Sequence, residues 1–331
     1  MRRVSVMAPA SSANLGPGFD VLGVALNVFY DIVEVSAEGD AVTLEAEGKY
    51  GSQVPLTPEK NTAGLVAKIF LEQYKIEGGV RIKINKGVPP SSGLGSSGAS
   101  AAGAAMALCE LYGVELSMDE LVELAAQGEM ASAGSPHADN VAPSICGGFT
   151  IVRKKKPFRV INLKPPENME FALLFPKVEV TVKKTERARG ILPKSVPLED
   201  AVYNIGNSCG LVAGILFSNL ELIGRCMEDK LAEPYRAATL PYYWSVRQRA
   251  VEAGASGVAI SGAGPCIIAI VDSLKVQAMK VAGEMLSALK EYSLDGESYV
   301  ARPSEGARVL YVEQLIWLGV YTFLMPRKRE R

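Results

Sequence analysis

The 331-residue sequence contains a single histidine, His137, and five cysteines that lack C-x-x-C spacing. One histidine excludes a multi-histidine metal site, and a Ser-His-Asp triad would have to use His137. Scattered cysteines in odd number argue against a disulfide framework and a structural zinc site. They favour reduced thiols, and therefore a cytoplasmic protein.

The sequence also lacks an excess of one charge and a long apolar run. With 35 basic and 36 acidic residues, its formal net charge is −1, which leaves no electrostatic footprint for nucleic acid. No run of about 18 apolar residues occurs, so we expect no membrane span. The N-terminus has no signal-peptide core. Apolar residues make up 48% of the chain, enough for one large domain or two medium ones.

Residues 89–102, Pro-Pro-Ser-Ser-Gly-Leu-Gly-Ser-Ser-Gly-Ala-Ser-Ala-Ala, are the stretch around which the sequence is organised. Glycine and proline prevent a helix from beginning before about Ser96, and residues 97–111 are typical of a buried helix with small side chains. A glycine-rich turn before a helix leaves backbone N–H groups at the positive end of the helix dipole, which favours a nucleotide phosphate. Taken alone, the stretch is equally compatible with a turn that only caps a helix.

This stretch fits neither of the two common phosphate-binding motifs. Residues 93–98 match the G-x-G-x-x-G spacing, but Pro-Pro-Ser-Ser precedes them and the strand expected at 80–84 alternates with charge. A dinucleotide-binding turn should instead follow a buried strand directly. A Walker loop would end in Gly-Lys-Ser/Thr, and no such lysine follows.

The remaining pattern predicts a mixture of strands and helices without strict alternation. Strands are expected at 4–8 (ending at Pro9), 31–36, 42–46, 81–85, 148–153, 158–163, 171–175 and on both sides of the turn 262–265. Helices are expected at 61–74, from a capping box at 117–120 to about 129, at 198–222 and at 274–292. Residues 11–20 and 131–140 are predicted to be polar loops. The pattern favours an α+β protein of two domains that join near residues 165–166.

A few further residues could serve phosphoryl transfer. Ser96 or Ser97 could offer a hydroxyl to Mg2+, and Glu129 a carboxylate, although spacing alone favours a solvated helix residue for Glu129. Arg189 and Arg236 could hold a substrate carboxylate, but surface arginines are common.

The turn at 261–265, Ser-Gly-Ala-Gly-Pro, could bring N–H groups to the same phosphates, or could be a simple hairpin turn. Together with residues 9–20 and 89–102, it makes three glycine-rich segments in an order that resembles the GHMP small-molecule kinases. Residues 13–20, Ala-Asn-Leu-Gly-Pro-Gly-Phe-Asp, and 134–143, Gly-Ser-Pro-His-Ala-Asp-Asn-Val-Ala-Pro, resemble the homoserine kinase branch of that superfamily. The similarity extends from about Val4 to Leu310.

The resemblance implies a two-domain α+β fold. Residues 1–164 would form an N-terminal domain of the ribosomal S5 domain 2-like type with the ATP phosphate loop, and residues 165–310 a ferredoxin-like C-terminal domain. Residues 311–331 continue beyond the family pattern as an apolar segment with a basic end. They could be an interfacial anchor, or could pack on the protein's own surface or into a dimer. A homodimer is expected.

The resemblance also implies an activity. ATP and Mg2+ would bind between the domains, and the γ-phosphoryl group would pass to the side-chain hydroxyl of L-homoserine. Two alternatives stay open: another GHMP alcohol kinase, acting on shikimate or mevalonate, or a non-catalytic nucleotide or metabolite sensor on the same fold.

The resemblance assigns residues to this site. The nucleotide positions are Asn61, near the base, and Pro89, Pro90, Ser91, Ser92, Gly93, Leu94, Gly95, Ser96, Ser97, Gly98 and Ala99 of the phosphate loop. Ser97 and Glu129 match the metal-associated pair. The substrate positions are Asn14, Asp20, His137, Thr185, Arg189, Arg236 and Gly262. The arginines would take the substrate carboxylate, and Asp20 the ammonium group.

The position at which mevalonate kinase and similar relatives carry a catalytic aspartate is Asn140 here. We therefore expect catalysis by positioning and charge neutralisation, with the proton leaving to a phosphate oxygen or to solvent. A loose phosphoryl-transfer transition state needs little help from a base. Asp139 is the rival candidate for a base.

Overall fold

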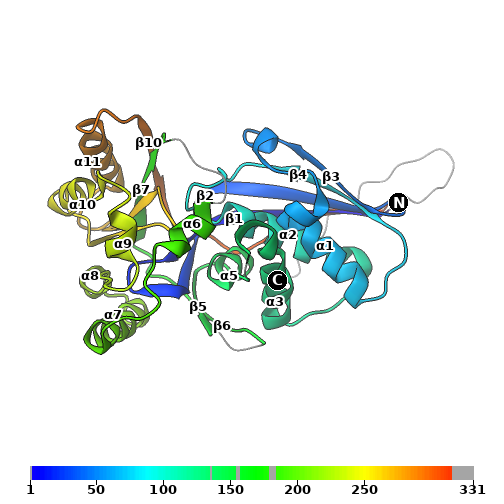
Figure 1. Cartoon of the computed structure of the whole chain (residues 1–331), viewed down its shortest axis with the longest axis horizontal. Coiled ribbons are helices and arrows are strands. Elements are labelled where there is room, and N and C mark those ends of the chain that lie inside the picture. Colours follow the sequence, from blue (N-terminus) through cyan, green and yellow to red (C-terminus); the bar gives the residue numbers. More distant parts are fainter. Residues whose placement is uncertain (1, 135, 154–156, 179–183, 315–331) are drawn as a thin grey trace.

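A computed structural model describes residues 2–134, 136–153, 157–178 and 184–314. They form two sheets, one of seven strands and one of four, each with helices packed against it. Figure 1 shows the long strands of the first sheet running through the centre of the molecule and the helices of the second unit gathered at one end. This is the two-domain α+β architecture that the sequence predicts.

The first sheet is built on two long antiparallel strands, β1 (Arg2–Asn14) and β2 (Gly18–Ala37). The strand order is β11-β1-β2-β4-β3, and β5 joins β2 while β6 joins β5. Only β3 and β4 pair in parallel. The other strands are β3 (Val42–Glu47), β4 (Val80–Asn85), β5 (Phe149–Arg153), β6 (Arg159–Leu163) and β11 (Arg308–Gln314).

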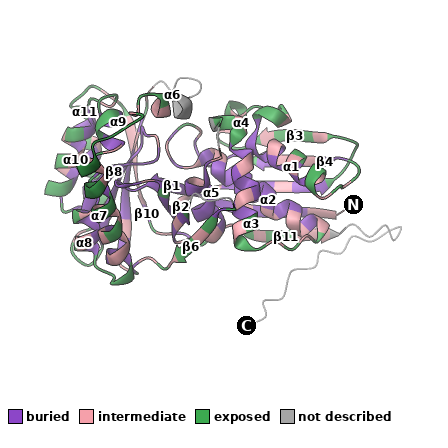
Figure 2. Ribbon diagram, turned by 60° about the horizontal axis from the view of Figure 1, so that its bottom comes forward, coloured by how far each residue is buried: buried purple, intermediate pink, exposed green. Residues whose placement is uncertain are grey.

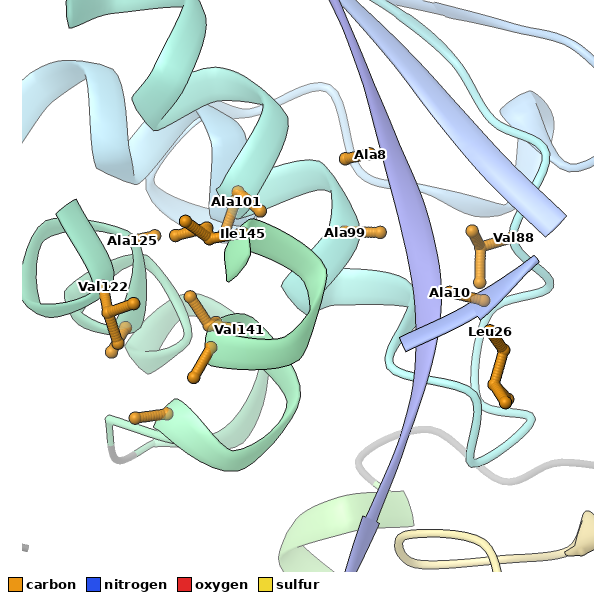
Figure 3. Close-up of a cluster of buried hydrophobic side chains, with 14 of the residues drawn as sticks. Ala8, Ala10, Leu26, Val88, Ala99, Ala101, Val122, Ala125, Val141 and Ile145 are labelled. Atoms are coloured by element: carbon orange, nitrogen blue, oxygen red, sulfur yellow. The ribbon is translucent and has the colours of Figure 1, made fainter. Parts of the chain in front are cut away.

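Helix α2 (Ser96–Tyr112) is the buried centre of the first domain. Its alanines and glycines allow close packing: a Cβ at Gly103 would lie 2.7 Å from Val33 Cγ2 on β2. Figure 3 shows Ala99 and Ala101 of this helix within the hydrophobic core. Three helices pack against α2: α1 (Thr62–Gln73), α3 (Met118–Gly128) and α5 (Ala138–Cys146). The other short elements of this domain are η1 (Gly51–Gln53), η2 (Pro58–Lys60) and α4 (Met130–Ala133).

The second sheet has the order β10-β7-β9-β8, with antiparallel neighbours throughout. Counted within this domain the order is 4-1-3-2, with helices after its first and third strands, as in a β-α-β-β-α-β fold. Its strands are β7 (Met169–Pro176), β8 (Gly257–Ile260), β9 (Ile267–Asp272) and β10 (Gly296–Ala301). Its helices are α6 (Lys184–Gly190), α7 (Leu198–Leu216), α8 (Leu220–Arg225), α9 (Glu233–Ala237), α10 (Tyr243–Glu252) and α11 (Ala278–Lys290).

Two predictions about the first glycine-rich segment were wrong. The first strand does not end at Pro9 but continues to Asn14, and β2 begins at Gly18, so little of residues 11–20 is irregular. The register between β1 and β2 shifts between Pro9 and Ala10. Such an irregularity accommodates a residue that has no N–H to donate. Helices α4 and α5 likewise occupy parts of 131–140, where a loop was predicted.

The chain returns to the first sheet at its end, because β11 pairs with β1. The boundary predicted at residue 310 therefore falls inside a strand of the first sheet. Beyond Gln314, the predicted extension lies outside the described residues.

Figure 2 shows the purple, buried strands and helices that join the two units. Across the described ranges, no helix has the length and apolar character that a membrane crossing requires.

Candidate active site

The three glycine-rich segments meet where the two domains join. The Ser261 hydroxyl, in the turn between β8 and β9, lies 2.7 Å from the Gly93 carbonyl oxygen and 2.8 Å from Ser12 Oγ on β1. The Asn14 amide donates to the Gly262 carbonyl at 3.1 Å. Segments separated by 168 and by 248 residues are thus joined by direct hydrogen bonds.

Glycine is required at two positions of the phosphate loop. Gly93 has φ +91°, and a Cβ there would lie 2.3 Å from the Ser261 carbonyl oxygen. Gly95 has φ +63° and precedes α2 as its N-cap, so no side chain caps the helix. The first N–H groups of α2 are left for a ligand at the positive end of the helix dipole.

A cavity of about 270 Å³ opens beside this helix start. Eight of the predicted nucleotide positions line this cavity: Asn61, Pro90, Ser91, Ser92, Gly93, Gly95, Ser96 and Ser97. Glu129, His137, Asn140 and Gly262 line it as well. Pro89, Leu94, Gly98 and Ala99 do not line it. Leu94 and Ala99 are buried in the hydrophobic core, and Gly98 packs against the backbone of residues 140–141.

Ser97 and Glu129 are brought together on the wall of this cavity. The Ser97 hydroxyl donates to Glu129 Oε2 at 2.9 Å. The side chain of Glu129 is buried, contrary to the solvated position that spacing favours, because α3 ends against α1: a Cβ at Gly128 would lie 2.7 Å from the Thr62 carbonyl. Burial raises the pKa of Glu129 to about 7. Its Oε1 has no hydrogen-bond partner within the described part of the chain.

A second polar cluster adjoins the cavity through His137 and Gly262. Arg189 Nη2 lies 2.8 Å and 3.0 Å from the two carboxylate oxygens of Asp20, and 3.3 Å from His137 Nδ1. The backbone N–H of Asp20 donates to Asn14 Oδ1 at 3.0 Å. Arg189 belongs to α6, as does Thr185, whose side chain lies outside the described part.

Arg236 completes this cluster from α9. The side chain is buried rather than on the surface, and burial lowers the pKa of its guanidinium. Its Nη1 donates to the Gly262 carbonyl at 2.7 Å. Both guanidinium groups also lie over the Phe19 ring, with Arg236 at 5.1 Å and Arg189 at 5.5 Å from its centroid. Two cations and one aspartate therefore face the same small space.

Asn140 and Asp139 occupy different sides of the start of α5. Asn140 lines the cavity, and its Oδ1 accepts a hydrogen bond from Ser11 Oγ at 3.1 Å. Asp139 is buried, and its carboxylate lies within 4.8 Å of side-chain ligand atoms of Asp20 and His137. Asp139 thus faces the second cluster.

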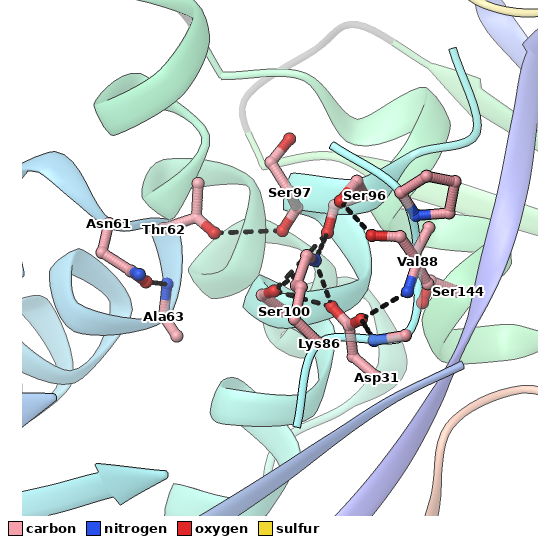
Figure 4. A network of polar contacts seen from close by, with 12 residues as sticks. Asp31, Asn61, Thr62, Ala63, Lys86, Val88, Ser96, Ser97, Ser100 and Ser144 are labelled. Atoms are coloured by element: carbon pink, nitrogen blue, oxygen red, sulfur yellow. Dashed lines mark hydrogen bonds and ion pairs between the residues drawn. The ribbon is translucent and has the colours of Figure 1, made fainter. Parts of the chain in front are cut away.

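Sequence analysis does not single out Lys86, which supports the phosphate loop from below (Figure 4). Its fully buried ammonium group pairs with the buried carboxylate of Asp31 and donates to the Ser96 carbonyl at 2.6 Å and to Ser100 Oγ at 2.9 Å. The other Asp31 oxygen accepts the N–H of Val88 at 3.0 Å. The sequence signal is weak: one lysine between a strand and a glycine-rich loop.

Sequence analysis also misses a buried pair behind the second cluster. Asn204 of α7 donates to Asp229 Oδ1 at 2.7 Å and lies 3.3 Å from the Pro17 carbonyl. Asp229 accepts the N–H of Glu233 at 2.8 Å, at the first residue of α9. The two side chains together therefore link the turn that precedes Asp20 to the helix that carries Arg236.

The arrangement suits transfer of a phosphoryl group to a small zwitterion. The helix start can bind phosphates, and the hydroxyl–carboxylate pair offers hard oxygen ligands. The neighbouring cluster offers guanidinium groups for a carboxylate and an aspartate for an ammonium group. Since His137 and Gly262 belong both to the cavity and to the second polar cluster, a nucleotide in the cavity and a small molecule in the cluster would lie in contact.

Comparison with known proteins agrees with this geometry. Residues 61–148 match the GHMP kinases N terminal domain, and residues 211–284 match the GHMP kinases C terminal family. Homoserine kinase from Methanococcus maripaludis is 45% identical over 271 residues, which are 82% of this chain and 88% of the relative. Homoserine kinase from Pyrococcus furiosus is 42% identical over 306 residues, 92% of this chain and 99% of the relative. A crystal structure of homoserine kinase from Cytophaga hutchinsonii superposes with a TM-score of 0.85 at 38% identity, covering 93% and 97% of the two chains.

Proposed function

Because this chain belongs to the homoserine kinase family of the GHMP kinases, we propose that it transfers the γ-phosphoryl group of ATP to the side-chain hydroxyl of L-homoserine. The products are O-phospho-L-homoserine and ADP. The observation that carries the proposal is the contact between a phosphate cradle and a cluster that holds two arginines and Asp20, with Asp139 beside them. An acceptor with one carboxylate and one ammonium group matches those charges.

The nucleotide lies along the cavity, with its phosphates at the start of α2. Backbone N–H groups of Ser96 and Ser97 face the phosphates, in the region where the helix dipole favours negative charge. Asn61 lines the same cavity. Its Oδ1 caps α1 by accepting the N–H of Ala63 at 3.0 Å, and its Nδ2 donates to the Pro55 carbonyl at 2.8 Å. It thereby fixes a segment that lines the cavity.

The residues present fit Mg2+. Glu129 offers a buried carboxylate oxygen that has no hydrogen-bond partner in the described part of the chain, next to the Ser97 hydroxyl. Hard oxygen ligands of this kind, with waters and phosphate oxygens, are what Mg2+ prefers. Bound there, the ion would neutralise charge on the phosphates. Glu129 and Ser97 then orient the nucleotide as well as binding the ion.

Homoserine binding exchanges one ion pair for two. In the structure, Arg189 and Asp20 bind each other. The substrate carboxylate would take Arg189 together with Arg236, and its ammonium group would take Asp20. Asn14 and His137 hold these partners in place, through the Asp20 N–H and the Arg189 guanidinium respectively. Thr185 remains a proposed contact on the same helix as Arg189.

We place no catalytic base in the site. Asn140 cannot accept a proton as a carboxylate would, and the reaction depends on alignment and charge neutralisation. Replacing Asp139 with Asn tests this directly in a steady-state assay. We expect kcat to stay within about tenfold of the natural enzyme, whereas a loss of about 10²–10⁴-fold would make Asp139 the general base. The kcat value decides, because Asp139 lies near the substrate cluster and KM also reports binding.

The function itself is tested by a coupled ADP-release assay with homoserine, shikimate, mevalonate or no added acceptor. Turnover that requires homoserine supports the proposal. Turnover with shikimate or mevalonate but not with homoserine would assign a different alcohol kinase, and no turnover with any acceptor would favour a sensor. A Glu129→Gln variant serves as the control for ADP release that does not depend on the proposed site.

Two broader expectations accompany this function. Five free thiols suit a reducing compartment, so we propose that the reaction takes place in the cytoplasm. We also propose that the protein acts as a homodimer.

A further inference from the structure

The ring of Phe19 is shared by the two arginines of the second polar cluster. The guanidinium of Arg236 lies 5.1 Å from the ring centroid, and that of Arg189 lies 5.5 Å from it. At both distances the negative face of an aromatic ring attracts a cation. The arginines belong to α9 and α6, and Phe19 is the second residue of β2. One partly buried aromatic side chain therefore contacts cations from two different helices.

The backbone of Asp20 explains how two consecutive residues reach the same guanidinium. Successive side chains of a regular strand point to opposite faces. Asp20 instead has φ +60°, in the left-handed region, which aspartate tolerates better than most residues, and its N–H donates to Asn14 Oδ1 at 3.0 Å. Because this conformation interrupts the alternation, Arg189 meets both the ring of Phe19 and, at 2.8 Å, the carboxylate of Asp20.

The two guanidinium groups repel each other, so other contacts must hold them in one place. Besides burial, the positive charge of Arg189 lowers the pKa of Arg236. Arg189 has the carboxylate of Asp20 as a partner. The buried Arg236 donates from Nη1 to the Gly262 carbonyl, whereas its Nε has no hydrogen-bond partner in the described part of the chain. The face of the Phe19 ring is a contact that both cations have in common.

We propose that Phe19 is a positioning residue whose ring holds Arg189 and Arg236 ready to bind one substrate carboxylate together. This role rests on the proposed function. When the acceptor binds, its ammonium group would take Asp20, and Arg189 would give up the carboxylate that it holds in the structure. The contact with the ring does not depend on that carboxylate, so it keeps Arg189 in place during the exchange. Without the ring, binding would have to order two long side chains, which weakens it.

The test changes the charge distribution of the ring while nearly keeping its shape. Fluorine withdraws electron density from the face of an aromatic ring and so weakens its attraction for a cation. Phenylalanines that carry one, two or three ring fluorines, incorporated at Phe19 alone, should raise KM for homoserine stepwise in the ADP-release assay. Phe19→Leu removes the aromatic face altogether and should raise this KM about tenfold, because both arginines must then be ordered on binding. KM for ATP and kcat should stay within about twofold.

Phe29 provides the matched control. It belongs to the same strand, is also partly buried, and packs edge-on against the ring of Tyr299 at 5.0 Å between centroids. Within the described ranges no lysine or arginine lies over its ring. The trifluorinated ring at Phe29 should therefore leave KM for homoserine and KM for ATP unchanged.

Each other outcome overturns the proposal. If Phe19→Leu raises KM for homoserine but the fluorinated rings do not, Phe19 acts by packing alone. If neither change affects this KM, other contacts hold the arginines. Equal increases in both KM values would show a general loss of order, which circular dichroism and urea unfolding of the variants also report. A natural protein without homoserine-dependent ADP release would refute the proposed function itself, and with it the substrate that this role of Phe19 requires.

Discussion

Replacing Lys86 with methionine should destabilise the protein, because it leaves Asp31 as a buried carboxylate without its cation. The two side chains are 1% and 0% exposed. Removing one partner of a buried ion pair costs about 3–5 kcal/mol. Asp31 would keep the N–H groups of Gly87 and Val88 and the Ser100 hydroxyl, so we expect a loss near the lower limit, about 3 kcal/mol.

The reverse change should cost less. In Asp31→Asn, the ammonium group of Lys86 would lose its partner, but burial already lowers the pKa of this lysine. In that variant Lys86 can therefore lose its proton and bind as a neutral amine, which avoids a buried charge without a partner.

Urea unfolding at pH 7, followed by circular dichroism, measures both losses and completes a double-mutant cycle. The double variant Lys86→Met, Asp31→Asn should lose less than the sum of the single variants, by at least about 1 kcal/mol. Additive losses within about 0.5 kcal/mol would refute a direct buried pair. Lys83→Met is a matched control, since Lys83, on β4, pairs with Glu47 of the neighbouring β3 at the surface.

The same variant should affect the nucleotide more than the acceptor. Lys86 donates to the carbonyl of Ser96, the first residue of α2, and so holds the phosphate cradle. We expect Lys86→Met to raise KM for ATP several-fold and to leave KM for homoserine nearly unchanged. A change confined to KM for homoserine would contradict this assignment.

Two further predictions concern the region behind the acceptor. Burial raises the pKa of Glu233 to about 7, above its ordinary value of 4.5, so between these pH values the folded protein binds a proton that the unfolded chain releases. The free energy of unfolding should therefore fall by up to about 3 kcal/mol as pH rises from 4.5 to above 7. Urea unfolding of Glu233→Gln should show that this pH-dependent loss has disappeared. Asn204→Ala removes the link between Pro17 and Asp229. In the ADP-release assay it should raise KM for homoserine about tenfold, while KM for ATP and kcat stay nearly constant. Equal changes in both KM values would instead indicate that the whole site has become less well ordered.

Local sequence signals predicted where the helix after the glycine-rich turn begins and that it is buried. The glycines and prolines before Ser96 restrict where a helix can begin, and α2 begins at that residue. Small side chains on this helix predicted its burial, because alanine and glycine permit the close contacts seen with β1 and β2. The capping box at Ser117 was equally local and is present. Each signal depends on neighbours within a few residues.

Features that depend on distant partners could not be predicted in the same way. Nothing near Glu129 in the sequence shows that α1 will bury it, and nothing near Arg236 shows that the turn at Gly262 will meet it. Lys86 and Asp31 are 55 residues apart and lie on separate strands or strand ends. The continuation of β1 through Pro9 required the register shift with β2. The resemblance to a family supplied the substrate positions that composition and spacing left open.

The unpredicted residues have a common property that bears on mechanism. Lys86 with Asp31, and Asn204 with Asp229, are buried polar pairs that support loops facing the ligands. Such pairs are costly to bury and contribute chiefly by fixing geometry. Phosphoryl transfer requires both ligands to be held in line, and in the proposed reaction the start of α2 would hold one, and Arg236 with the turn before Asp20 the other. The two pairs support these two sides of the site separately, which is why we expect their removal to change different KM values.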